Sequence, residues 1–154
     1  RKVANLPKLT AALDDPNEAI RWWGALGCAM LRKEAAPAEA ALRKRLEDPS
    51  GAVQAAAADA LAQLGHADLS LPVLERWITN TSGTFYTLHA ANVLIRLGEA
   101  GRPLLPVMKQ LQAATADASN NTAPAYLNRI LERDIALLEG REPALVYPKF
   151  AGGK

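Results

Sequence analysis

Apolar residues recur at intervals of three and four in three segments of the chain, 20–31, 53–64 and 86–97. In the middle segment this stripe consists of Val53, Ala56, Ala57, Ala60, Leu61 and Leu64. The other two stripes are Ile20, Trp23, Gly24, Gly27, Cys28 and Leu31, and Tyr86, His89, Ala90, Val93, Leu94 and Leu97. Such spacing places all members of a stripe on one face of an α-helix. A second apolar set in the same segments, Leu26, Ala58 and Ala91, predicts that each helix is covered on two sides.

The helical segments belong to a repeat of 33 residues. The sequence LDDP at 13–16 returns as LEDP at 46–49, and the LG pair at 64–65 returns at 97–98. We expect Asp15, with Glu18 three residues later, and Asp48 to cap the helices that begin at the two prolines. Gly65 and Gly98 suit the left-handed position that ends a helix. The repeat therefore predicts units of two helices each, because a single unit cannot bury its own apolar face.

Four such units are expected, at about 6–32, 37–65, 71–98 and 103–140, and the segment 141–154 is expected to be a non-helical tail. Pro7, Pro37, Pro72 and Pro103 are predicted to open the first helix of successive units. The last unit is degenerate, and its final helix has the polar outer face of a terminal cap. The predicted fold is all-α, a short right-handed α-solenoid of four helical pairs.

Charge and cysteine content exclude several classes of protein. Lys and Arg number 18 against 16 Asp and Glu, a formal charge of +2, which is too weak a bias to indicate nucleic acid or an anionic membrane as partner. The one cysteine, Cys28, permits neither an internal disulfide nor a cysteine zinc site, and its place on the stripe predicts a core residue. No apolar run approaches the length of a membrane span. Because the chain starts with neither Met nor a signal peptide, we expect a piece of a longer polypeptide.

The period, the DP turns and the LG closings resemble HEAT repeats. A narrower resemblance lies in the sequences LPVL at 71–74, HAANVL at 89–94 and LGEAGRPLLP at 97–106. These are similar to the HEAT-like C-terminal region of bacterial sulfatases of the formylglycine type. The resemblance implies a secreted or periplasmic parent enzyme that hydrolyses sulfate esters, with its catalytic residues outside this segment. The family signature C/S-x-P/A-x-R is matched only in part at 28–32, because Met30 stands at the Pro or Ala position.

We assign no catalytic, cofactor-binding or metal-binding residue to this segment. His66 and His89 have neither a nearby cysteine nor an acidic pair at ligand spacing. Trp23 lies on the stripe and is expected in the core, whereas Trp22 points about 100° away and can line a surface. The predicted docking surface consists of Arg21, Trp22, Val146, Tyr147 and Phe150.

Three functions follow from these observations. The favoured one is an accessory domain that packs against the catalytic domain of the same chain. The alternatives are a free-standing adaptor that binds another protein, and a repeat-type DNA glycosylase. Asn92, which stands among small and apolar residues at the position of Leu26 and Asp59, is expected to join the third unit to a neighbour through hydrogen bonds.

Overall fold

The computed structural model describes residues 3–80, 84–117 and 122–142, and most of these are helical, with no β-strand among them. The α-helices are α1 (Leu6–Ala12), α2 (Glu18–Leu31), α3 (Glu39–Arg45), α4 (Gly51–Leu64), α5 (Ala67–Thr79), α6 (Thr84–Leu97), α7 (Leu105–Ala114) and α8 (Ala123–Leu138). Short 3₁₀ helices cover Val3–Asn5, Arg32–Ala38 and Gly98–Leu104. The predicted all-α solenoid is confirmed.

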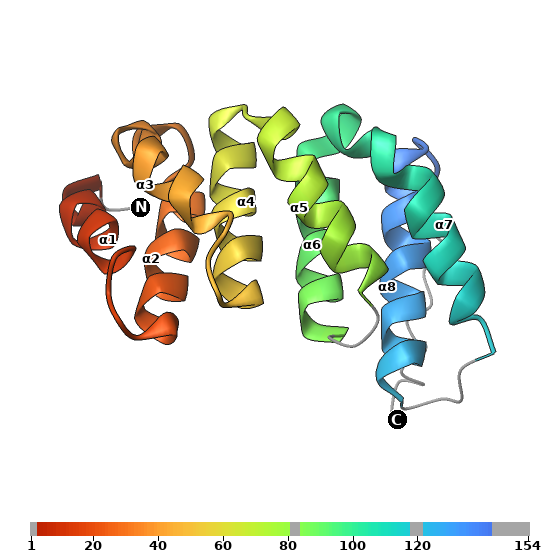
Figure 1. The fold of residues 1–154 in the computed structure, drawn as a ribbon. Coiled ribbons are helices and arrows are strands. Elements are labelled where there is room, and N and C mark those ends of the chain that lie inside the picture. Colours follow the sequence, from red (N-terminus) through yellow and green to blue (C-terminus); the bar gives the residue numbers. More distant parts are fainter. Residues whose placement is uncertain (1–2, 81–83, 118–121, 143–154) are drawn as a thin grey trace, which may run out of the picture.

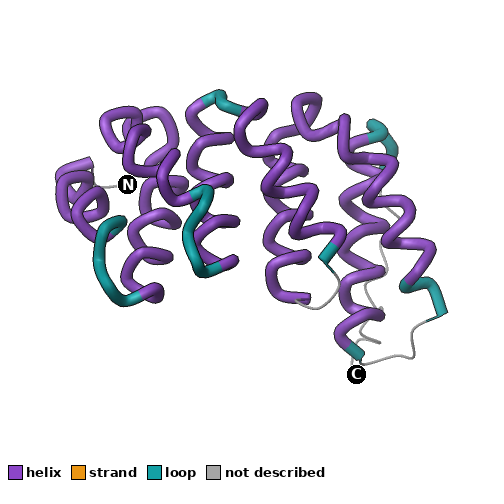
Figure 2. The backbone as a smooth tube through the Cα atoms, viewed as in Figure 1, coloured by secondary structure: helices purple, strands orange, loops and turns teal. Residues whose placement is uncertain are grey.

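The helices form two layers. The second helices of the pairs, α2, α4, α6 and α8, stand side by side, and each contacts the next along the row (Figure 1). The first helices, α1, α3, α5 and α7, pack against the other side of this row, and short loops join the elements (Figure 2). Among the residues that the structure describes, no layer of helices covers the opposite face of the second helices, which we call the uncovered face.

Helix α4 lies at the centre of the molecule and connects two hydrophobic cores. All eight residues from Ala55 to Ala62 are buried. Ala57 and Leu61 belong to the core shared with α2 and α3, whereas Ala58 and Ala62 belong to the core shared with α5 and α6. Alanine predominates here because only small side chains let neighbouring helices approach on every side.

The helix starts differ from the predicted caps. Helix α2 begins at Glu18, and its N-cap is Asn17, whose side chain accepts a hydrogen bond from the N–H of Ala19 at 2.9 Å. Asp15 instead accepts the N–H of Asn17 at 2.8 Å, so the capping box predicted for it is wrong. Asp48 makes the same bond to the N–H of Ser50 at 3.0 Å, before α4. Both aspartates form the turn that precedes the helix, because their short side chains reach the amide two residues later.

The glycine prediction is confirmed, whereas three of the four proline predictions are wrong. Gly65 has φ 100° and Gly98 has φ 55°, both in the left-handed region. Pro7 lies in the first turn of α1, as expected. Pro37 and Pro103 lie inside the 3₁₀ helices that precede α3 and α7, and Pro72 lies in the interior of α5. A proline there leaves the carbonyl of Asp68 without its helical donor. Asp68 and Pro72 are both exposed, so water can reach that carbonyl.

Candidate functional site

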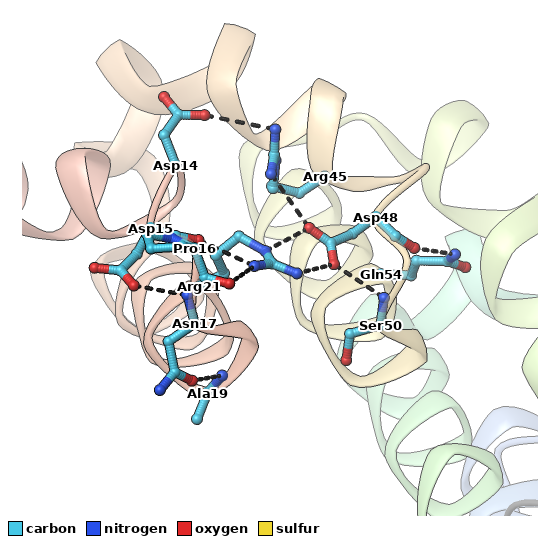
Figure 3. A network of polar contacts seen from close by, with 10 residues as sticks. All are labelled: Asp14, Asp15, Pro16, Asn17, Ala19, Arg21, Arg45, Asp48, Ser50 and Gln54. Carbon is cyan, nitrogen blue, oxygen red and sulfur yellow. Dashed lines mark hydrogen bonds and ion pairs between the residues drawn. The ribbon is translucent and has the colours of Figure 1, made fainter.

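Arg21 was predicted to face a partner, but its side chain binds groups of the first two units instead. Its side chain is 11% exposed, and Nε and Nη2 donate to the two carboxylate oxygens of Asp48 at 2.8 Å each (Figure 3). Its Nη1 donates to the carbonyls of Asp15 and Pro16 at 3.0 Å. Because these donors are bonded within the protein, the guanidinium has a structural role: it connects α2 to the turn before α4.

Asp48 is the centre of this network and not the N-cap of α4, which is Ser50, so the capping role predicted for it is wrong. Besides the two bonds from Arg21 and the bond from Ser50, it accepts Arg45 Nη1 at 3.2 Å (Figure 3). Burial by itself would raise the pKa of Asp48, but the bonds from Arg21 and Ser50 outweigh burial and hold it below its usual value. Gln54, the repeat equivalent of Arg21, donates to the Asp48 carbonyl at 2.7 Å.

The two tryptophans of α2 are placed the opposite way from the prediction. Trp23 is 61% exposed, whereas Trp22 is half-buried against the core of the first two units. Their rings meet edge to face with centroids 4.6 Å apart. The prediction failed because the buried face of α2 includes Ala25 and Ala29, which are turned away from the predicted stripe. The other members of the predicted docking surface, Val146, Tyr147 and Phe150, lie outside the described residues.

Two cavities lie along α4 on the uncovered face, both bounded by α2 and α6. The first, which we call the polar cavity, has a volume of about 340 Å³. It is lined by Leu26, Ala29, Met30, Arg32, Asp59, Gln63, His89 and Arg96. The second, the aromatic cavity, has a volume of about 260 Å³ and is lined by Glu18, Ala19, Trp22, Ser50, Ala52 and Tyr86. No residue of a first helix lines either one, so both open on the same side of the molecule.

The polar cavity contains an ion pair between the buried carboxylate of Asp59 and the exposed guanidinium of Arg96. Asp59 is 4% exposed and accepts Arg96 Nη2 at 2.5 Å. His89 Nε2 lies 3.9 Å from the same carboxylate oxygen and is buried without a hydrogen bond. Burial lowers the pKa of His89, and although the Asp59 charge opposes this, the Arg96 charge adds to it. The imidazole is therefore neutral at pH 7, and Arg96 is the cation that balances Asp59.

Arg32 is the other cation of the polar cavity, and sequence reasoning did not identify it. It ends α2 with φ 58° and ψ −130°, in the place that Gly65 and Gly98 hold in the next two repeats. Its side chain is exposed and makes no hydrogen bond or ion pair within the described part of the chain. The 33-residue alignment was the signal that could have shown it.

Exposed apolar side chains gather on the second helices. Trp23 and Met30 of α2 are 61% and 62% exposed, and Tyr126 and Leu137 of α8 are also exposed. Tyr126 and the half-buried Ile130 line a third cavity of about 220 Å³ between α6 and α8. The uncovered face is therefore partly apolar, as surfaces that bind other proteins are.

A model of the family described as HEAT repeats matches residues 6–95, which is more than half of the chain. The chain belongs to the HEAT-repeat family. No curated protein and no solved structure matches it. Nothing in these comparisons connects it to sulfatases. HEAT repeats are generally non-catalytic domains that often bind proteins, and this segment is a helical-repeat interaction domain.

The buried position of Cys28 within the HEAT array confirms that it is a core residue. It is fully buried, and burial raises the pKa of its thiol to about 11. Because the thiolate is the reactive form of cysteine, this thiol is inert at neutral pH.

Each of the two histidines of the HEAT units lies beside a carboxylate. His66 Nε2 lies 3.1 Å from Glu39 Oε2, and His89 is beside Asp59. Across residues 3–80, 84–117 and 122–142, no three His, Cys, Asp or Glu side chains are grouped so that they could hold a metal ion. Over the same ranges, no helix has the length and apolar character to span a membrane.

Asn92 joins the third and fourth HEAT units, as predicted. Its side-chain nitrogen donates to the Leu88 carbonyl within α6 at 2.9 Å, and its oxygen accepts Arg133 Nη2 of α8 at 3.0 Å. The partner in the neighbouring unit is thus a guanidinium, whereas we expected a carbonyl or an N–H group of a turn. A long arginine side chain can span the distance between two helices of the row more easily than a backbone group can.

Proposed function

We propose that this HEAT-repeat domain binds a segment of a partner protein along α4, filling the polar and aromatic cavities together. The observation that carries the proposal is the common arrangement of the two cavities. Each has α4 as its floor, α2 on one side and α6 on the other. A single extended segment laid along α4 would therefore enter both.

The dimensions of the face agree with such a ligand. Ala52, in the aromatic cavity, and Asp59, in the polar cavity, are seven residues apart on α4, or about 10 Å along the helix axis. An extended peptide covers that distance with about three residues. Trp23 and Met30 of α2 present exposed apolar area beside this path, and aromatic anchors of this kind supply much of the affinity in protein interfaces.

We further propose that the partner is the catalytic domain of the same polypeptide, a secreted sulfatase. The support is the resemblance of the sequence at 97–106 to sulfatase C-terminal regions. Sequencing the native polypeptide tests this narrower proposal. A native chain without a C/S-x-P/A-x-R signature elsewhere would contradict it, and the partner would then be a separate protein.

Site-specific photocrosslinking tests the binding face itself. A benzoylphenylalanine at Met30, in the native full-length polypeptide, should crosslink to a segment outside the solenoid. The crosslinked peptide, identified by mass spectrometry, then shows whether the partner belongs to the same chain. The matched control is the same residue at Ala40, which is exposed on α3 in the other layer. Equal crosslinking at the two positions, or none at Met30, would contradict the proposal.

A further inference from the structure

Arg32 has a positive φ at a position where the next two repeats have glycine, and its ψ of −130° lies far from the left-handed helical value of 6° that Gly65 has. Its φ of 58° is the one positive φ of a non-glycine residue in the described ranges, and its equivalents are Gly65 and Gly98. A side chain in this region of φ and ψ costs of the order of 1 kcal/mol or more relative to glycine. Because only this repeat has a strained residue at the position, we infer that the arginine side chain has a function that offsets the loss of stability.

The side chain of Arg32 is also the unbalanced charge of the polar cavity. The other cation, Arg96, is 2.5 Å from the buried carboxylate of Asp59, so these two charges cancel. Arg32 has no such partner among the residues that the structure describes. Leu26 and Met30 form an apolar part of the cavity wall.

We propose that the polar cavity binds the carboxylate of an acidic side chain, Asp or Glu, in the partner segment, with Arg32 as its cation. This inference rests on the proposed function and names the chemistry of the bound segment. A guanidinium offers paired N–H donors that match the two oxygens of a carboxylate. Leu26 and Met30 would contact the methylene groups that carry it.

The charges of the face favour an acidic protein segment over nucleic acid. Within the described part of the chain, the polar cavity has one positive charge without a partner, that of Arg32, and the aromatic cavity, about 10 Å away along α4, carries the carboxylate of Glu18. A nucleic-acid backbone would require a continuous row of cations. The ligand expected here has an acidic residue in the polar cavity and an apolar residue about three positions away, in the aromatic cavity.

Binding of defined peptides tests this inference. The probes are two pools of acetylated and amidated decapeptides, identical except that one fixed position is Glu in the first pool and Gln in the second. Tryptophan fluorescence reports binding, since Trp22 lines one cavity and Trp23 is exposed on α2. We expect the Glu pool to bind about fivefold to tenfold more tightly at low salt.

Variants at position 32 separate this role from a structural one. Arg32→Gly should raise the melting temperature, because it removes the backbone strain, and should abolish the preference for Glu. Arg32→Lys should retain part of the preference for Glu. The control Lys33→Gln, which removes an exposed neighbouring cation, should retain the full preference.

The outcomes distinguish failure of the inference from failure of the proposed function. If both pools bind equally, and an Ala52→Leu change in the aromatic cavity weakens that binding, the preference for an acidic ligand is refuted. The proposed binding face is then retained. Absence of binding by either pool to the folded protein would overturn both. Tight, salt-sensitive binding of a DNA duplex that depends on Arg32 would also overturn the acidic peptide as ligand.

Discussion

The ion pair between the first two HEAT units should control the stability of the N-terminal half, and Asp48→Ala tests this. The change removes the acceptor of two 2.8 Å bonds from Arg21 and leaves that guanidinium, 11% exposed, without a carboxylate. Removing one partner of a buried pair costs about 3–5 kcal/mol. Arg21 keeps its bonds to the carbonyls of Asp15 and Pro16, so we expect the lower end, about 3 kcal/mol.

Urea unfolding followed by circular dichroism measures this loss. For a chain of this size, about 3 kcal/mol corresponds to a fall in melting temperature of roughly 6–12 °C. The matched control is Asp15→Ala at the equivalent repeat position. Asp15 accepts the N–H of Asn17 and makes no ion pair within the described ranges, so its loss should cost about 1 kcal/mol. A decrease in the urea m-value of Asp48→Ala would show that the first unit unfolds separately.

The stability lost in Asp48→Ala should depend on pH in a direction that the pKa of Asp48 determines. The folded-state pKa of Asp48 is held below its unfolded value of about 3.9, so its stabilisation is complete above that pH. It is lost as the pH falls through the lower folded-state pKa. The difference between the native protein and Asp48→Ala should therefore shrink below about pH 4. If Asp48→Ala costs no more than Asp15→Ala at pH 7, or costs equally at pH 2, the reasoning is refuted.

Three further predictions concern the core and the unit joins. A Cβ at Gly101 would lie 2.5 Å from the carbonyl oxygen of Leu94, so Gly101→Ala should cost about 1–3 kcal/mol in urea unfolding; an unchanged midpoint would contradict the close approach. Cys28, with its pKa raised to about 11, should react with iodoacetamide at pH 8 only in urea, and rapid labelling of the native protein would disprove its burial. Asn92→Ala removes the acceptor of Arg133 and should lower the free energy of unfolding by about 1 kcal/mol, whereas an unchanged melting temperature would show that this bond contributes nothing.

The repeat pattern predicted the fold because its signals are local. The stripe at 53–64 identified a helix that the structure buries from Ala55 to Ala62, and the closing glycines took the left-handed conformation that a Cβ disfavours. The same pattern failed on α2. Trp22 and Trp23 are about 100° apart on the helix, and which of them is buried depends on where α1 and α4 press against it.

The candidate site was only partly visible in the sequence. The alignment of Arg32 with Gly65 and Gly98 can be read from the chain, and it marks a position where a side chain is unfavourable. The function of the Arg32 side chain cannot be predicted from the sequence. The cavity that Arg32 lines is completed by Asp59 and Arg96, which are contributed by two other helices.

By itself, the sequence determined the helices, their pairing into repeats and the glycine turns, because these follow from periodicity and backbone conformation within a few residues. Only the tertiary structure decided how far each helix is rotated against its neighbours, and this rotation determines which side chains meet. Arg21 and Asp48 are 27 residues apart in the chain, and Asp59 and Arg96 are 37 apart. Such pairs form where stacked units bring distant side chains together, so the uncovered face and its cavities are properties of the stack.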